Sequence, residues 1–340
     1  MKILLFLFSI IYGLISSLRN LLFDVGIFKT KSFSIPIICI GNLNAGGSGK
    51  TPHTDYIFKV LANKKVAIIS RGYKRKSKNL YNVEIDSDFN MVGDEPLMLK
   101  RKNPNALVVV GANRIQAINY IIKNYHDVEV ILLDDGFQHR WVKAGLNILL
   151  TSYHKPFYKD NLLPYGHLRE NKKQSKRADY IVTTNIENDL ESSEIKSIRN
   201  EISKISQAKL SFSSIKYLEP RNIFNNEVFD IAGCNIVLIS GIANTVSFEK
   251  YIKTQSSIIK HFKFKDHHNY SKEDIKNILS YCDSIKSTKK IILTTEKDSV
   301  KLVQFKEDFK NMEVVFLPIE IVMLDQGEFN KKIIGYVDGN

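Results

Sequence analysis

Cysteine is scarce in this sequence, and the few cysteines form no recognisable framework. Cys39, Cys234 and Cys282 are widely separated, so neither a disulfide scaffold nor a cysteine-based metal spacing is present. This usage is typical of a protein in a reducing compartment, where such residues serve as small apolar side chains. Internal repeats and low-complexity tracts are also absent. The 340 residues therefore correspond to one large or two ordinary globular domains.

Acidic residues are the second deficit. The 36 aspartates and glutamates are outnumbered by 49 lysines and arginines, which gives a formal net charge of +13. Such a charge favours anionic partners, including nucleotides, phosphorylated substrates and an acidic membrane surface. The sequence contains neither a zinc finger nor a basic motif interleaved with stacking aromatics, so we expect no nucleic-acid partner.

The apolar run near the N-terminus falls short of a membrane span. Polar and small residues interrupt it between residues 3 and 18, whereas a spanning helix needs about 20 apolar residues. At helical spacing, one side carries Leu4, Leu7, Phe8, Ile11, Leu14, Leu18 and Leu21. We predict that residues 1–28 form a helix lying in the plane of a membrane surface. A true span and a helix packed on the protein's own core remain alternatives.

Apolar, β-branched runs then alternate with helix-like segments, from "SIPIICIGN" to "DYIVTTN". This alternation is typical of a parallel sheet covered by helices on both faces. The pattern restarts with "NIVLISG" and "KKIILTTEKD" after a polar passage. We predict an α/β fold with a nucleotide-binding domain at 29–205, an extended linker at 206–235 and a smaller α/β lobe at 236–340. The second lobe would close an active-site cleft.

The segment "NAGGSGKTP" at 44–52 follows the first apolar strand and resembles a phosphate-binding loop, or P-loop. Its glycines leave room for backbone N–H groups to surround phosphate, Lys50 adds charge, and the Thr51 hydroxyl suits Mg²⁺. Asn44 replaces the usual first glycine, and asparagine tolerates a left-handed backbone. The expected nucleotide-binding residues are Asn44, Gly46, Gly47, Ser48, Gly49, Lys50 and Thr51.

A second acidic motif, "VEVILLDDGFQHR", places Asp134 and Asp135 at the carboxyl end of an apolar strand. In P-loop folds an acidic residue at this position holds Mg²⁺, directly or through water. Which aspartate contacts the metal stays open. Gln138 and His139 follow directly and are expected to face the cleft.

Several further motifs occur in a fixed order and make the chain recognisable. With the N-terminal segment, they resemble the tetraacyldisaccharide 4′-kinase family of lipid A biosynthesis from about Tyr12 to Leu302. The motifs are "GNLNAGGSGKTP", "SRGYKRK", "VGDEPLMLKRK", "LLDDGFQHR", "LLPYGHLRE", "FKDHHNY" and "TTEKDSVKL".

This resemblance implies an ATP- and Mg²⁺-dependent kinase. Its acceptor would be the 4′-hydroxyl of a tetraacyldisaccharide 1-phosphate lipid, and its product the bis-phosphorylated lipid A precursor. It also implies a location at the cytoplasmic face of the inner membrane, on an anionic surface, and we expect a monomer.

The resemblance further implies roles for individual residues. Asp94 of "GDEP" looks like the base that accepts the hydroxyl proton, and His267 or His268 of "DHHNY" like its partner. Lys50 and Asp135 would act on the transferring group. The expected metal-site residues are Thr51, Asp134 and Glu170.

The expected acceptor-binding residues are Arg71, Tyr73, Arg114, Gln138 and His139, and Lys297 and Asp298 are expected near the nucleotide. For the "SRGYKRK" loop and for Arg114, a solvated surface position is an equally open alternative.

Two other functions compete with the kinase. A deviant-Walker ATPase would usually carry lysine where this chain has Ala45, and it would lack the "DDGFQHR" and "DHH" motifs. A membrane-associated nucleotide switch would explain the P-loop and the N-terminal helix. It would leave Asp94 and His267 without a role.

Overall fold

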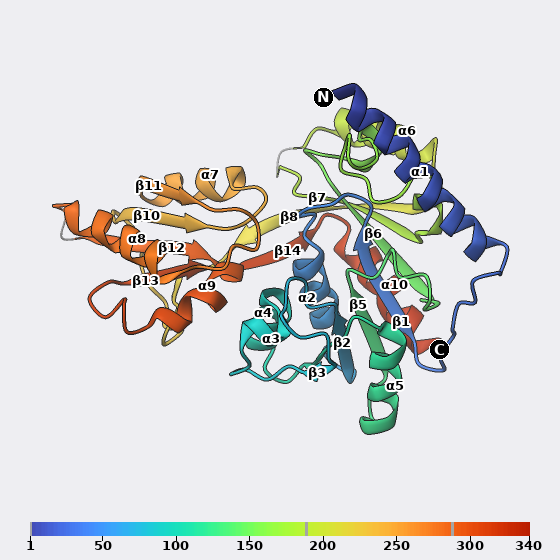
Figure 1. Ribbon diagram of the computed structural model, residues 1–340, viewed down its shortest axis with the longest axis horizontal. Coiled ribbons are helices and arrows are strands. Elements are labelled where there is room, and N and C mark those ends of the chain that lie inside the picture. Colours follow the sequence, from blue (N-terminus) through green and yellow to red (C-terminus); the bar gives the residue numbers. More distant parts are fainter. Residues whose placement is uncertain (1, 188–189, 287–288) are drawn as a thin grey trace.

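The structure is a computed structural model that describes residues 2–187, 190–286 and 289–340. Two sheets form the centres of two lobes, a nine-stranded sheet in the larger lobe and a five-stranded sheet in the smaller one (Figure 1). Helices flank both sheets, and most neighbouring strands are parallel. The predicted α/β fold with a second, smaller lobe is therefore confirmed.

The larger sheet has the strand order β14-β8-β7-β6-β1-β5-β2-β4-β3, and only its outermost pairs, β14 with β8 and β3 with β4, are antiparallel. The first of its strands in the chain lies at the middle of the sheet, so the loop that follows is surrounded by other strand ends. The strands are β1 (Ile37–Asn42), β2 (Val66–Ser70), β3 (Tyr81–Asn82), β4 (Leu107–Val110), β5 (Val130–Asp134), β6 (Leu146–Ser152), β7 (Tyr180–Thr184), β8 (Lys209–Tyr217) and β14 (Ile319–Met323).

Alternate residues of these strands pack on opposite faces of the sheet. Ile38 and Ile40 of β1 belong to the cluster that contains α2 (Lys50–Val60), α4 (Asp94–Lys102) and α10 (Gln326–Asp338). Ile37 packs with α5 (Arg114–Asn124), and Cys39 packs with α6 (Ser192–Ser203) on the other face. Burial on both faces explains the continuous apolar runs. The remaining short helices of this lobe are α3 (Phe89–Val92), η1 (Phe157–Lys159) and η2 (Lys172–Arg177).

The smaller sheet has the order β11-β10-β12-β13-β9. The helix α7 (Val246–Gln255) packs on one face, while α8 (Lys272–Ser284) and α9 (Glu296–Leu302) pack on the other with the short η3 (Val303–Phe305). The strands are β9 (Arg221–Asn222), β10 (Asn235–Ser240), β11 (Ser257–Lys263), β12 (Lys290–Thr295) and β13 (Val314–Leu317).

The expected domain boundaries need correction at two places. Within the segment 206–235, β8 is a strand of the larger sheet and pairs with β7. The chain also returns to the larger lobe after β13, because β14 pairs with β8 and α10 packs against α2. The periodicity of 236–340 gave no sign of this return, since a strand is equally apolar whichever sheet it joins. Two antiparallel strands, β8 and β14, therefore run between the lobes (Figure 1).

The N-terminal helix α1 (Lys2–Asp24) lies along the outside of the larger lobe (Figure 1). Its apolar side chains point away from the body, and its small and polar side chains pack inward, which reverses the usual pattern of a surface helix. By length and composition it is apolar enough to cross a membrane. The exposed side chains include Leu4, Leu7, Phe8, Ile11, Leu14, Leu18 and Leu21, all of those predicted to share one side.

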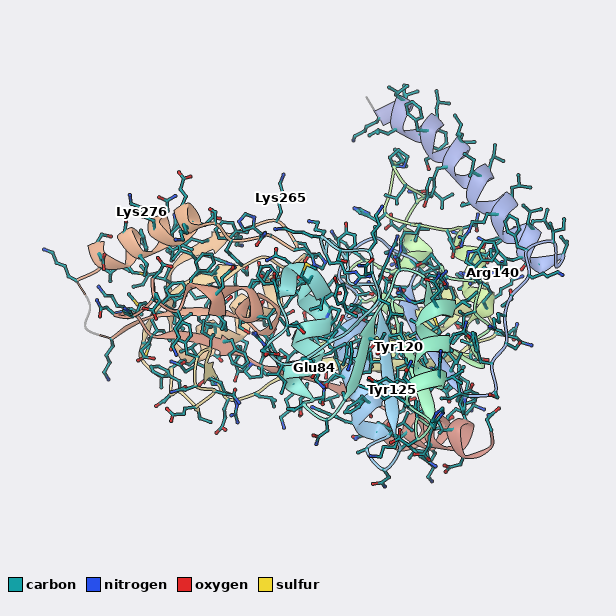
Figure 2. The ribbon with its side chains drawn as sticks, turned by 60° about the horizontal axis from the view of Figure 1, so that its bottom comes forward. Glu84, Tyr120, Tyr125, Arg140, Lys265 and Lys276 are labelled. Atoms are coloured by element: carbon teal, nitrogen blue, oxygen red, sulfur yellow. The ribbon has the colours of Figure 1, made fainter. Side chains whose placement is uncertain are left out.

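Hydrogen bonds hold α1 to the body along much of its length. The Ser9 hydroxyl donates to the Leu162 carbonyl oxygen at 3.0 Å, and the Tyr12 hydroxyl donates to the Arg169 carbonyl oxygen at 2.8 Å. At the other end, Arg140 donates to the Asn20 carbonyl oxygen at 2.9 Å and also pairs with Asp24, and Figure 2 shows Arg140 beside this end of the helix. These contacts fix the helix against the lobe over three turns or more.

Replacing Gly41 with alanine tests the packing beneath the P-loop. A Cβ at Gly41 of β1 would lie 2.5 Å from the Phe137 Cβ and 2.8 Å from the Phe137 backbone nitrogen. Because the backbone cannot yield easily, we expect Gly41→Ala to lower the free energy of unfolding by about 2 kcal/mol or more. Gly335→Ala in α10 has open space and should raise it by roughly 0.5–1 kcal/mol. Thermal and denaturant unfolding measure both, and equal effects would contradict the packing described.

Candidate active site

The P-loop joins β1 to α2 and has the backbone that a phosphate cradle requires. Gly46 has φ 118° and Gly49 has φ 79°, values that favour glycine. Gly49 is the N-cap of α2, and no described side chain caps this helix end. Its N–H groups and the positive end of the helix dipole are thus available to an anion. The Ser48 hydroxyl is buried and has no partner among the described residues, as expected for an atom that meets a ligand.

Asn44 is accommodated for a reason different from the expected one. It is not among the described residues with positive φ, so tolerance of a left-handed backbone is not needed. Instead, the Asn44 amide donates to the Asp160 carboxylate at 2.9 Å, and Asn44 forms an isolated β-bridge with Leu168. The segment 160–170 therefore braces the entry to the P-loop. A glycine at position 44 would lose the side-chain part of this support.

Asp134 lies at the end of β5 beside the P-loop helix. Hydroxyls of Thr51, Thr54 and Ser70 lie 3.2–3.4 Å from its oxygens. Burial, together with the nearby Glu95 and Asp135 carboxylates, raises the pKa of Asp134 to about 7. A cation beside such a carboxyl would strongly stabilise its ionised form.

Asp135 has φ 53°, and its carboxylate turns toward two cations. Arg169 Nη2 lies 3.0 Å from Oδ1, and Lys50 Nζ lies 3.9 Å from Oδ2. Burial alone would raise the pKa of Asp135, but Lys50 and Arg169 outweigh it and lower that pKa. The adjacent aspartates are thus held in opposite electrostatic environments.

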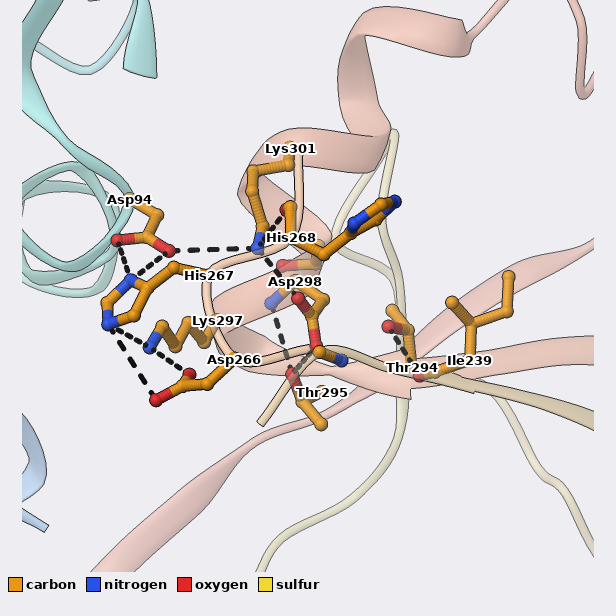
Figure 3. A network of polar contacts seen from close by, with 12 residues as sticks. Asp94, Ile239, Asp266, His267, His268, Thr294, Thr295, Lys297, Asp298 and Lys301 are labelled. Atoms are coloured by element: carbon orange, nitrogen blue, oxygen red, sulfur yellow. Dashed lines mark hydrogen bonds and ion pairs between the residues drawn. The ribbon is translucent and has the colours of Figure 1, made fainter. Parts of the chain in front are cut away.

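Asp94 and His267 meet across the two lobes (Figure 3). Asp94 is the first residue of α4, and His267 follows β11 in the smaller lobe with φ 57°. His267 Nδ1 lies 3.1 and 3.0 Å from the two oxygens of Asp94. Of the two candidate histidines, His268 instead pairs with Asp274 at 3.0 Å. The geometry therefore singles out His267.

Lys297 fixes the orientation of the His267 ring. Its Nζ lies 3.1 Å from His267 Nε2 and 3.0 Å from Asp266 Oδ1 (Figure 3). It also pairs with Glu95. Because an ammonium only donates, Nε2 accepts and Nδ1–H donates to Asp94. Burial would raise the pKa of Asp94, but His267, Lys297 and Lys301 outweigh it and lower that pKa to about 2. Asp94 is thus held ionised.

Within the described residues, Glu170 makes no hydrogen bond or ion pair with Thr51 or Asp134, with which it was expected to share a metal site. Its side chain is 1% exposed and binds Arg177 at 2.7 Å, Asn20 at 3.1 Å and Arg19 at 3.4 Å. Two of these partners belong to α1. A carboxylate already neutralised by two guanidinium groups is a poor metal ligand, so we infer that Glu170 anchors α1.

The expected acceptor-binding residues divide into two groups. Arg114 is 2% exposed and donates to the Gly111 and Asp134 carbonyl oxygens at 2.6 and 3.3 Å. These bonds support the turn at Asp134, while Arg114 Nε is buried without a partner among the described residues. Arg71 and Tyr73 are exposed, and the Tyr73 ring packs edge-on against His267 at 5.0 Å between centroids.

Gln138 and His139 keep unpartnered atoms within the described part of the chain. Gln138 donates to the Asn42 carbonyl oxygen at 2.8 Å, while its own side-chain oxygen and His139 Nε2 are buried without partners there. Burial, with Arg114, Arg19 and Arg71 nearby, lowers the pKa of His139 to about 4. His139 is therefore neutral at pH 7 and retains one nitrogen for a ligand.

Sequence reasoning missed three residues that organise the site. Arg169 joins Asp135 to Asn42, Asp160 supports Asn44, and Lys301 contacts Asp94. All three lie in motifs that were noticed or next to them, but side chains that meet from distant segments leave no local spacing to find. Lys297 and Asp298 were expected near the nucleotide; in the structure Lys297 contacts His267, and Asp298 pairs with Lys301.

The fold and the loop after β1 define the class of P-loop nucleotide-binding proteins. The family described as tetraacyldisaccharide-1-P 4′-kinase matches residues 1–338, and this chain belongs to that family.

Individual relatives agree with this assignment. The tetraacyldisaccharide 4′-kinase of Bacteroides thetaiotaomicron is 38% identical over 351 residues, covering 98% of this chain and 92% of the relative. That of Flavobacterium psychrophilum is 38% identical over 342 residues, covering 99% and 97%. The crystal structure of LpxK from Aquifex aeolicus in complex with ATP superposes with a TM-score of 0.77 at 31% identity, covering 99% of both chains.

Glu170→Gln tests whether Glu170 anchors α1 or binds metal. Because the change leaves two partly buried arginines without a counter-charge, we expect the free energy of unfolding to fall by roughly 2–4 kcal/mol. The Mg²⁺ concentration that gives half-maximal phosphate transfer should stay unchanged. Glu320→Gln, which removes a half-exposed pair with Lys59, is the matched control and should cost less than about 1 kcal/mol. A stable Glu170→Gln protein that needs far more Mg²⁺ would restore the metal role.

Proposed function

We propose that this chain transfers the γ-phosphate of ATP to the 4′-hydroxyl of a tetraacyldisaccharide 1-phosphate lipid. Membership of the 4′-kinase family supports this acceptor. The observation that carries the proposal is the buried Asp94–His267 pair, which joins the two lobes. The pair lies close to the P-loop, since the charge of Glu95, the residue after Asp94, raises the pKa of Asp134. A nucleotide switch would not require such a pair.

In the proposed reaction the sugar hydroxyl attacks the γ-phosphorus, and the bond to the leaving ADP oxygen breaks. Asp94 accepts the hydroxyl proton. Its low pKa makes it a weak base toward a resting hydroxyl, but the hydroxyl becomes strongly acidic once its oxygen begins to bond to phosphorus. An ionised carboxylate therefore orients the hydroxyl first and receives the proton late. His267 Nδ1–H and the Lys297–His267 contact hold that carboxylate in place.

Lys50 and Asp135 would act on the phosphate side of the same reaction. Lys50 follows the P-loop glycines, where an ammonium can reach the β- and γ-phosphates. In the structure it lies 3.9 Å from Asp135, which keeps it near the loop. Arg169 holds Asp135 from the other side and so limits where that carboxylate can move.

The residues at the P-loop also fit Mg²⁺. No group of three or more His, Cys, Asp or Glu side chains suited to a metal is found within the described ranges. Mg²⁺ bound to ATP needs no such group, because phosphates and waters supply most of its ligands. Thr51 and Asp134 would hold it, and a cation there would stabilise the charged form of Asp134. When bound, Mg²⁺ would neutralise charge on the transferring phosphate.

The acceptor's own phosphate would meet Arg71 and His139. Arg71 is exposed after β2 and is close enough to His139 to lower its pKa. His139 offers a neutral nitrogen, and Tyr73 packs on His267. These side chains line the carboxyl edge of the larger sheet beside the Asp94–His267 pair.

Transfer of label from [γ-³²P]ATP to tetraacyldisaccharide 1-phosphate in detergent micelles tests the proposed function. We expect labelled bis-phosphorylated lipid from the wild type. Because Asp94→Asn removes the proton acceptor, its kcat should fall roughly 10²–10⁴-fold while ATP binding is retained. Lys50→Ala should weaken both ATP binding and phosphate transfer.

The adjacent histidines provide the matched control for this assay. His267→Asn should lower kcat well below that of His268→Asn, since only His267 contacts Asp94. ATP hydrolysis without any labelled lipid, from a folded wild-type protein, would contradict the kinase and favour a nucleotide switch.

We also propose that α1 places the enzyme on an anionic membrane surface, with the site at the cytoplasmic face of the inner membrane. A helix that is bonded to the body from Ser9 to Asp24 cannot also sit across a bilayer without burying the lobe. Its outward apolar side chains fit a position in the plane of the interface. The net charge of +13 suits anionic head groups.

Vesicle binding tests this arrangement. Leu7→Glu with Ile11→Glu should weaken partitioning onto phosphatidylglycerol-containing vesicles roughly tenfold or more. Two aliphatic side chains that would enter the bilayer are then lost. Thermal stability should not change, since both side chains are exposed. Val228→Glu with Val246→Glu, equally exposed on the smaller lobe, is the charge-matched control. Equal loss of binding in both pairs would show a purely electrostatic effect and contradict insertion of α1.

A further inference from the structure

Lys301 is a buried cation beside Asp94 that the proposed reaction leaves without a role. It belongs to α9 of the smaller lobe and is 2% exposed, although lysine is rarely buried so completely. Its Nζ lies 2.9 Å from Asp298 Oδ1, 2.9 Å from the His268 carbonyl oxygen and 3.6 Å from Asp94 Oδ2 (Figure 3). The ammonium thus donates to one carbonyl oxygen and lies within ion-pair distance of two carboxylates.

We propose that Lys301 is a positioning residue that holds the Asp94 carboxylate ionised and correctly oriented for the acceptor hydroxyl. The proposal rests on the role proposed above for Asp94. Lys301 itself would touch neither ATP nor the lipid, and it would act only through Asp94.

The position of Lys301 is fixed from within its own lobe. Asp298 is fully buried, and its Oδ2 accepts the Gly241 N–H at 2.8 Å and the Thr295 hydroxyl at 2.8 Å. Its other oxygen binds Lys301. The ends of β10 and β12 thus hold Asp298, Asp298 holds Lys301, and Lys301 reaches across to Asp94. Such a chain transmits the position of the smaller lobe to the carboxylate.

The two oxygens of Asp94 have different partners because of this contact. Oδ1 accepts the Glu95 N–H at 2.9 Å, while Oδ2 lies nearest to Lys301, and His267 Nδ1 lies between them. The carboxylate plane is therefore defined from three directions. Lys297 cannot replace Lys301, since it is engaged with Glu95, Asp266 and His267 Nε2.

A simple structural ion pair would not need Asp94. Asp298 alone could neutralise Lys301, and the ring of Tyr270 at 5.3 Å also favours a cation there. A buried ammonium next to Asp94 also lowers the pKa of this proposed base, which a pair with Asp298 alone would not do. The titratable and charged groups facing Asp94 are His267 from the loop after β11, Lys297 and Lys301 from α9, and Glu95 from its own helix. Removing Lys301 raises the pKa of Asp94 and so makes protonation easier.

The test is the pH dependence of phosphate transfer by Lys301→Met and Lys301→Gln. We expect kcat to fall roughly tenfold or more at pH 7.5, where Asp94 stays ionised, because its orientation is lost. KM for ATP should stay within about twofold of the wild type, because Lys301 would not contact ATP. The acid limb of kcat/KM should move to higher pH by roughly one unit in both variants, since an opposite charge within about 4–6 Å shifts the pKa of a carboxyl by that order. Should the methionine variant not fold, the glutamine variant, which keeps polar contacts, carries the same expectation.

Lys290→Met is the matched control. Lys290 is partly buried and donates to the Cys282 and Ile285 carbonyl oxygens at 2.8 and 3.1 Å, with no contact to Asp94. It should lower the melting temperature and leave the pH profile unchanged.

A wild-type kcat and acid limb in Lys301→Gln would overturn the proposal, because the charge would then be dispensable. Asp94→Asn, assayed in parallel, separates this failure from that of the proposed function. If the Asp94→Asn protein is active, Asp94 is not the proton acceptor and the proposed function of this residue fails. If the Asp94→Asn protein is inactive and the pH profile of Lys301→Gln is unshifted, only the proposed role of Lys301 fails.

Discussion

The site depends on ion pairs between two short helices that belong to different lobes. Asp94 and Glu95 at the start of α4 face Lys301 and Lys297 of α9, and Lys102 at the end of α4 faces Glu296 at 2.9 Å. The charges on the two helices are complementary in order as well as in sign. Buried pairs cost much of their attraction in lost hydration. We therefore infer that they determine the relative position of the helices more than they add stability.

A second constraint links the outer helix to the phosphate loop. The segment 160–170 contacts α1 through Glu170 and its carbonyl oxygens, braces Asn44 through Asp160 and holds Asp135 through Arg169. One short segment is therefore in contact with the proposed membrane helix, with the P-loop and with the acidic turn. Its structure explains both why asparagine is suitable at position 44 and why Glu170 is buried against Arg177 and α1.

Local pattern predicted the fold class, the P-loop and the outward apolar side of α1, because each depends on neighbouring residues or on a simple period. It could not predict that β14 and α10 return to the larger lobe, since an apolar strand carries no record of its partner. The partners of Glu170 could not be predicted for the same reason: its arginine partners are 7 and 151 residues away in the chain. The resemblance to the kinase family selected Asp94 and His267, and only the structure distinguished His267 from His268.

The central claim is that Asp94 and His267 act as one unit assembled from both lobes. A double-mutant cycle on phosphate transfer tests it most directly, with Asp94→Asn, His267→Asn and the double variant compared with wild type. The account predicts that the double variant is no less active than Asp94→Asn alone, because His267 would have nothing left to orient. Losses that multiply in the double variant would contradict it and would give the two residues independent roles.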